Sequence, residues 1–178
     1  MKGQERSQKT LRVAICAMLS ALGVVALYIG ALIDVLDISM AVVASLFAIF
    51  AVIEYGAGAA WSIYGVTGII SVILLPQKLP AAMYILFFGF YPIIKEKIES
   101  VSKKVLQWAL KEVVFNLCLV VLMVLGTKLL YLDTNGLFVF EAVFFLLANF
   151  TFVIYDIALT RLISLYIYKL RSKFKGYK

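Results

Sequence analysis

Lys95-Glu96-Lys97-Ile98-Glu99-Ser100-Val101-Ser102-Lys103-Lys104 is the only interior stretch of this sequence that is dense in charge. Before it, back to Arg12, runs a long apolar field whose only basic residue is Lys78, and after it the sequence is again mainly apolar. Charged side chains are expensive inside hydrocarbon, so this stretch is predicted to be a loop at the membrane surface. Lys and Arg accumulate in short cytoplasmic loops, which places the loop on the inside.

Composition sets the class of protein. Of the 178 residues, 64% are hydrophobic and only 15% are charged, whereas about a quarter of a soluble domain is charged. We therefore expect an all-α integral membrane protein, surrounded by membrane lipid and crossing a cell membrane several times, with the bacterial plasma membrane as the expected one. The net charge of +7 is explained by positive residues on the inner side, so no nucleic-acid partner is expected.

The apolar runs predict a bundle of six transmembrane helices with both termini in the cytoplasm. At about 20 residues per span, the expected spans are 10–33, 38–53, 57–75, 81–94, 105–130 and 137–168. The expected organisation is a cytoplasmic lead-in over residues 1–9, a membrane domain over residues 10–168 and a basic cytoplasmic tail over residues 169–178. The second and fourth runs are short, so either could be tilted, broken or re-entrant.

The distribution of basic residues fixes the expected orientation. With the amino terminus inside, fifteen of the 17 Lys and Arg residues lie on the cytoplasmic side or at its edge, and only Lys78 and Lys128 lie outside. The inverted arrangement would reverse this ratio.

The sequence offers no catalytic or metal-binding constellation. It contains no His, which removes imidazole acid–base catalysis and His-ligated zinc. Its glycines match neither nucleotide-binding fingerprint, and Cys16 and Cys118 lie in apolar runs where they are interpreted as small hydrophobic residues. No enzyme activity, cofactor or metal site is expected.

Small residues share one face of the first predicted helix. At about 100° per residue, Ala14, Ala17, Ala21 and Tyr28 fall within one narrow arc. Small residues allow another helix to approach closely, and this packing drives association in lipid. The arc is predicted to contact either a separate protein or a neighbouring helix of the same chain.

A polar stripe runs along the sixth predicted helix and comprises Glu141, Phe145, Asn149, Phe152 and Asp156. Polar groups in a span point into the bundle, because lipid offers them no hydrogen bonds. A matching stripe on the fifth helix comprises Glu112, Asn116 and Thr127. Two explanations stay open: a ligand cavity or ion path, or interhelical pairing in which Asp156 or Glu112 contacts Lys95, Lys97, Lys111 or Arg161.

Further candidates lie at the expected outer ends of the helices: Tyr28, Asp34, Asp37, Tyr84, Tyr131, Asp133 and Asn135. Tyrosines at this depth are common interfacial anchors. They would equally form the lid of a small-molecule pocket, which is typically apolar with a few fixed polar groups.

Taken together, the short chain, the six apolar spans and the motif Ala14-x-x-Ala17-x-x-x-Ala21 resemble the substrate-binding S components of energy-coupling factor (ECF) vitamin transporters. The motif looks like the alanine motif with which that family's first helix docks on the transmembrane coupling subunit. The resemblance implies that Ala14, Ala17 and Ala21 are partner-docking residues, and that separate ATPase subunits hydrolyse ATP.

The same resemblance implies a small vitamin-like solute bound from outside, among Tyr28, Asp34, Asp37, Tyr84, Glu141, Phe145 and Asn149. No vitamin signature is recognised, so the solute stays open. Two alternatives have comparable features. One is a small membrane scaffold of the MreD type, and the other is a stand-alone ion-coupled carrier using Glu112 and Asp156.

Overall fold

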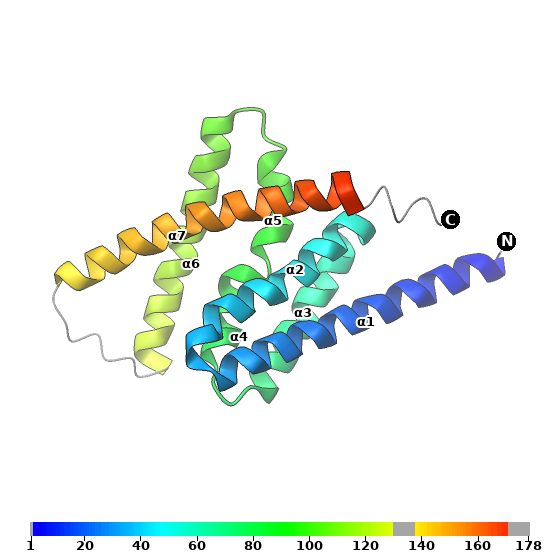
Figure 1. The fold of residues 1–178 in the computed structure, drawn as a ribbon, viewed down its shortest axis with the longest axis horizontal. Coiled ribbons are helices and arrows are strands. Elements are labelled where there is room, and N and C mark those ends of the chain that lie inside the picture. The colour runs from blue at the N-terminus through cyan, green and yellow to red at the C-terminus, as the bar shows by residue number, and fades with distance from the viewer. Residues whose placement is uncertain (1, 130–137, 171–178) are drawn as a thin grey trace. The chain divides into compact units, whose positions relative to one another are not determined.

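The computed structural model describes residues 2–129 and 138–170, with the side chains of residues 2–7, 34, 126–129, 138–142 and 170 outside that description. All regular structure in these residues is helical (Figure 1). The elements are α1 (Lys2–Leu32), the 3₁₀ turn η1 (Asp34–Leu36), α2 (Asp37–Tyr55), α3 (Ala57–Leu74), α4 (Leu79–Met83), the π-helical turn η2 (Tyr84–Phe88), α5 (Tyr91–Glu99), α6 (Lys104–Leu129), α7 (Phe138–Leu165) and the π-helical turn η3 (Tyr166–Leu170).

The chain divides into two compact units, Met1–Leu132 and Asp133–Lys178. The first contains α1 to α6, and the second contains α7 and η3.

Five helices are long and apolar enough to cross a membrane in the described part of the chain. They cover Gln8–Leu32, Asp37–Tyr55, Ala57–Leu74, Lys104–Leu125 and Val143–Lys169. Each of them carries large apolar side chains that are exposed, a surface that would promote aggregation in water and that lipid covers. The all-helical class and the compatibility with a multi-pass membrane protein agree with the sequence prediction.

The fourth predicted span is not one regular helix. Residues 81–94 are divided between α4, η2 and α5, with Gly89 and Phe90 between the last two. In η2 the amide of Gly89 donates to the carbonyl of Tyr84 at 2.7 Å, five residues back rather than four. Since Gly89 and Phe90 keep right-handed helical angles, the chain follows a bent helical path from Leu79 to Glu99.

The charged stretch at 95–104 is only partly a loop. Helix α5 continues to Glu99 and α6 begins at Lys104, which leaves residues 100–103 as the connection. The prediction of a loop over the whole stretch was therefore wrong for residues 95–99. Charge decides whether a segment can enter hydrocarbon, but it does not prevent a helix from extending into water.

Two buried clusters mark opposite ends of the helical group formed by α1, α2 and α3. At the end where α2 begins, Ala31, Ala41, Leu75, Ala81 and Tyr84 belong to one cluster. At the end where α2 finishes, Ala51, Ala60, Ile63 and Ile93 form the other, with Cys16 packed against it. The path from Leu79 to Glu99 therefore starts at the first end of the group and finishes at the second.

The second end is closed by Arg12 and by a glycine turn. Arg12 Nη2 donates to the carbonyl of Tyr55, and its guanidinium lies 5.6 Å from the centroid of the Tyr55 ring. Gly56 then separates α2 from α3 at a φ of 83°, a conformation that costs glycine little. Arg12 and the charged residues after Ile93 thus lie toward the same end of this unit, whereas Lys78 lies at the other end, in the turn between α3 and α4.

Candidate functional site

The predicted docking face lies on the exposed side of α1. Ala14, Ala17 and Ala21 are all exposed, whereas Leu27 and Ala31 of the same helix pack in the buried cluster. Contact with α2 or α3 therefore does not cover the alanines. A row of small side chains on an exposed helix face leaves the backbone accessible to another helix.

The candidate solute residues of the first unit occupy different environments. Tyr28 is partly exposed on α1, and Asp34 lies in η1. Asp37 begins α2 and is buried. Tyr84, expected at the outer end of a helix, is completely buried in the cluster with Leu27 and Ala31. Burial shows that Tyr84 is a core residue of this unit and not an anchor at the membrane surface.

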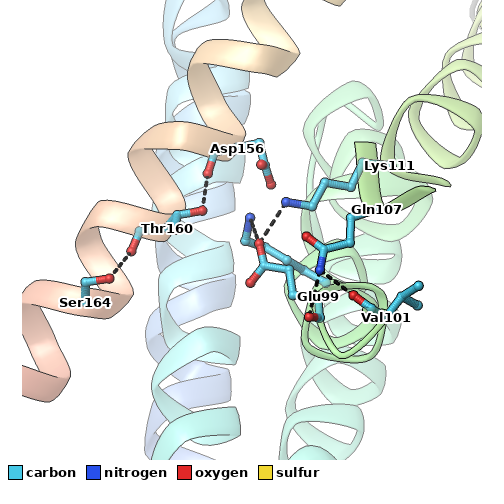
Figure 2. A network of polar contacts seen from close by, with 8 residues as sticks. Glu99, Val101, Gln107, Lys111, Asp156, Thr160 and Ser164 are labelled. Carbon is cyan, nitrogen blue, oxygen red and sulfur yellow. Dashed lines mark hydrogen bonds and ion pairs between the residues drawn. The ribbon is translucent and has the colours of Figure 1, made fainter. Parts of the chain in front are cut away.

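The remaining candidates belong to the second unit and lie on α7. Asn149 Nδ2 donates to the carbonyl of Phe145 at 2.8 Å, which brings these two residues together on consecutive turns. Further along the same helix, Thr160 donates to the carbonyl of Asp156 and Ser164 to that of Thr160 (Figure 2). Glu141 lies in α7 with its side chain outside the described part. Of the other predicted polar residues, Tyr131, Asp133 and Asn135 and the side chain of Thr127 also lie outside it.

On the fifth predicted span, now α6, the polar stripe is held together by its own helix. Asn116 Nδ2 donates to the backbone carbonyl of Glu112 at 2.9 Å and lies 3.5 Å from a Glu112 carboxylate oxygen. Glu112 and Asn116 therefore lie on one face of α6, one turn apart. Whether Glu112 or Asp156 carries an ion or pairs with a lysine stays a prediction.

An apolar groove of about 320 Å³ lies along α3 and η2. It is lined by Tyr64, Gly65, Gly68, Ile69, Val72, Ile73 and Ile85. None of the seven predicted solute residues lines it. A lining without charged side chains suits hydrocarbon rather than a polar solute.

Tyr64 organises the neighbourhood of this groove. Its hydroxyl donates to the carbonyl of Ile85 in η2 at 2.9 Å. Its ring packs edge-on to Trp61 and Phe90 and lies tilted over Tyr84, with the centroids of the two tyrosine rings 6.0 Å apart. Tyr64 therefore connects α3 to the π-helical turn η2 and to Phe90, which follows it.

An ionic cluster with two buried lysines joins α5 to α6. Glu99 Oε1 lies 2.8 Å from Lys95 Nζ and 2.7 Å from Lys111 Nζ. The two lysine side chains are only 1% and 6% exposed, whereas Glu99 is 36% exposed. Because buried ammonium groups are costly without a counter-charge, one carboxylate here stabilises two lysines.

Helices α5 and α6 form a hairpin, and the side-chain amide of Gln107 also links them. Gln107 Nε2 donates to the carbonyl of Glu99 at 3.0 Å and to that of Val101 at 2.6 Å. Figure 2 shows Gln107 and Lys111, both on α6, reaching back to Glu99 and Val101. Since carbonyls at the end of a helix have no partner within it, Gln107 fixes the end of α5 and the turn after it.

The two lysines also determine the protonation of Glu99. Partial burial by itself raises the pKa of the Glu99 carboxyl, but hydrogen bonds from Lys111 and Lys95 outweigh burial, and the pKa is lowered from its ordinary value of 4.5. Glu99 is therefore ionised at neutral pH. Sequence reasoning treated this stretch only as a marker of topology and missed the cluster. The spacing of Lys95 and Glu99, four residues apart, was the available signal.

The structure places no group of three or more potential metal ligands together among the described residues. Cys118 is buried and Cys16 partly buried, both as free thiols. Compared with known proteins, the chain matches no family model, no curated protein and no solved structure. The functional assignment therefore depends on the residues themselves.

Proposed function

We propose that this chain is the substrate-capture subunit of an ECF-type uptake transporter. It binds a small vitamin-like solute from outside the cell and docks through α1 on a transmembrane coupling subunit. The observation that carries this proposal is the exposure of Ala14, Ala17 and Ala21. The core of the first unit leaves this face uncovered, as a helix that docks on another protein requires.

The proposed topology has six crossings and cytoplasmic termini. Five crossings correspond to the long apolar helices. The sixth is the helical path over the apolar residues 81–94, a short run for a hydrocarbon core of about 30 Å, with the charged residues 95–99 of α5 at the membrane surface. The two buried clusters support it, because α4 packs at one end of the helical group and α5 at the other.

This topology puts the basic residues on one side. Arg12 contacts Tyr55 at the end toward which α5 runs, and Lys78 lies at the opposite end. By the positive-inside rule, the Arg12 end faces the cytoplasm. Solute would then enter from the side of Asp34, Asp37 and the start of α7, and ATPase subunits would act on the cytoplasmic side through the coupling subunit.

Native mass spectrometry of the chain, purified without added solute, tests the solute half of this proposal. A retained small molecule is expected, and isothermal titration then measures its affinity for variants. Glu141→Ala and Asn149→Ala should each weaken binding by about 1–3 kcal/mol, the loss when a buried polar group has no partner. Thr151→Ala is the matched control, because this exposed hydroxyl on α7 donates only to the carbonyl of Leu147 in its own helix.

A scaffold of the MreD type is the second candidate function, and two observations favour it. The groove along α3 and η2 is lined by apolar residues and Tyr64, and Tyr84, a candidate solute residue, is enclosed in the core. A scaffold needs the exposed α1 face but no solute. Purified protein that retains no small molecule and still binds a membrane partner through α1 would support the scaffold instead.

A further inference from the structure

The lysines of the α5–α6 hairpin fall into two groups. Lys95 and Lys111 are buried and share Glu99. Lys97, Lys103 and Lys104 are exposed, and in the described part of the chain no ion pair joins any of these three to a carboxylate. We call these three residues the hairpin lysines. Because Glu99 is occupied by the buried pair, the hairpin lysines present unneutralised positive charge.

Exposed apolar side chains follow directly after the hairpin lysines. Val105, Leu106 and Trp108 are all exposed at the start of α6. Lys104 and Trp108 are four residues apart and so lie on one face of the helix. Lys111 Nζ lies 5.2 Å from the centroid of the Trp108 ring, a cation–π contact that orients the indole. Positive charge thus adjoins an apolar surface that contains a tryptophan.

We propose that the hairpin lysines bind the headgroups of anionic phospholipids while Val105, Leu106 and Trp108 contact the acyl chains below. Charge complementarity selects this partner, because a bilayer leaflet rich in anionic lipid attracts basic segments at its surface. Tryptophan is enriched at the depth where headgroups meet acyl chains. A soluble anion would satisfy the lysines but leave the adjoining apolar side chains in water.

The hairpin is held in one geometry for this contact. Gln107 fixes the carbonyls of Glu99 and Val101, and Ser100 Oγ donates to the carbonyl of Lys97 at 2.7 Å. The Gln107 bonds connect α6 to the end of α5 and the turn after it, and the Ser100 bond closes the last turn of α5, so the hairpin lysines extend from a hydrogen-bonded turn. The proposal concerns the membrane environment of the chain and is independent of the proposed transport function.

Tryptophan quenching in nanodiscs tests the contact. The chain has two tryptophans, so Trp61→Phe leaves Trp108 as the single reporter. Nanodiscs contain phosphatidylglycerol and phosphatidylcholine, with the acyl chains of one or the other brominated. At low salt, brominated phosphatidylglycerol should quench Trp108 more strongly than brominated phosphatidylcholine at the same mole fraction. Each of Lys103→Gln and Lys104→Gln should reduce the relative association constant about fivefold.

Lys78→Gln is the matched control, because it removes one positive charge from the turn at the other end of the unit. Its Nζ donates to the carbonyls of Val72 and Leu75, and the quenching preference should not change. In the Trp61→Phe protein with its hairpin unmutated, high salt should abolish the preference by screening, so this arm of the test needs no substitution in the hairpin.

Two results would overturn the proposal. One is equal quenching by both brominated lipids at low salt. The other is a preference that inorganic phosphate removes at an ionic strength where sodium chloride does not, which would show that the hairpin lysines form a site for a soluble anion.

Discussion

The ring of Tyr64 lies against Gly89 so closely that a β-carbon at position 89 would be 2.6 Å from Tyr64 Cδ2. The same β-carbon would lie 2.8 Å from two ring atoms of Tyr84. Gly89 follows the π-helical turn in ordinary right-handed geometry, so glycine is needed here for space and not for its backbone freedom. Two tyrosine rings therefore close around one glycine, directly after the π-helical turn of the fourth run.

Gly89→Ala should destabilise the protein by about 1–3 kcal/mol, the usual cost of adding a methyl group to a packed site. The rings of Tyr64 and Tyr84 would have to move, and Tyr64 would strain its hydrogen bond to Ile85. Thermal unfolding in detergent measures the change.

Gly65→Ala is the control for this prediction, because a β-carbon there meets no atom within 4 Å. Alanine is a better helix former than glycine, so this variant should be as stable as the parent or slightly more stable. Equal stability of Gly89→Ala and Gly65→Ala would show that the tyrosine rings do not confine position 89.

The helical class and most helix ends could be predicted from the sequence, because long apolar runs and their breakers are local signals. Helix α1 ends at Leu32, α2 at Tyr55 and α3 at Leu74, each within two residues of the predicted ends at 33, 53 and 75. The close packing at Gly89 could not be predicted, since it involves Tyr64, which is distant in the sequence. The burial of Tyr84 has the same origin, because an isolated tyrosine in an apolar run fits an anchor and a core residue equally well.

For the candidate site, helical periodicity predicted that Ala14, Ala17 and Ala21 share a face, but only packing shows that this face is exposed. Similarly, the local bond between Asn149 and Phe145 follows from their spacing on one helix. The role of Glu99 was missed, because its second partner, Lys111, lies on the next helix and contacts it only when the hairpin forms.

Glu99→Gln should destabilise the protein by about 1–3 kcal/mol, the range for losing charged hydrogen bonds and leaving a buried partner less well satisfied. Glu96→Gln is the matched control, because Glu96 is an exposed residue of the same helix. Thermal unfolding at neutral pH compares the two variants. Equal effects would mean that the ionic cluster contributes no specific stability.

The pH dependence of stability gives a separate test of the same cluster. The pKa of Glu99 is lowered in the folded protein from an ordinary 4.5, so its contribution is fully present above pH 4.5. That contribution is lost as the pH falls below 4.5 and through the folded pKa, where the carboxylate takes up a proton. The parent protein should therefore lose more stability than Glu99→Gln over this acidic range. Parallel profiles of stability against pH for the two proteins would contradict a lowered pKa of Glu99 in the folded protein.

The proposed orientation is tested by labelling single cysteines in intact cells. In a background with Cys16 and Cys118 replaced by alanine, a cysteine from Ser100→Cys should resist an impermeant thiol reagent. One from Asn135→Cys should react, because residue 135 follows the fifth crossing on the outer side. Permeabilised cells provide the control for reactivity at position 100. The reverse labelling pattern would show that the orientation is inverted and that the predicted solute residues face the cytoplasm.

Complex formation through α1 tests the central proposal most directly. The chain is co-expressed with the coupling and ATPase subunits of its own organism and purified through the coupling subunit. Ala17→Trp and Ala21→Trp should abolish recovery of the complex while the isolated chain folds normally, because both alanines are exposed and a large ring blocks close helix approach. Leu22→Trp, at an exposed position about 100° away around the same helix, should leave the complex intact. Undiminished recovery with both alanine variants would contradict docking through this face and, with it, the assignment as a substrate-capture subunit.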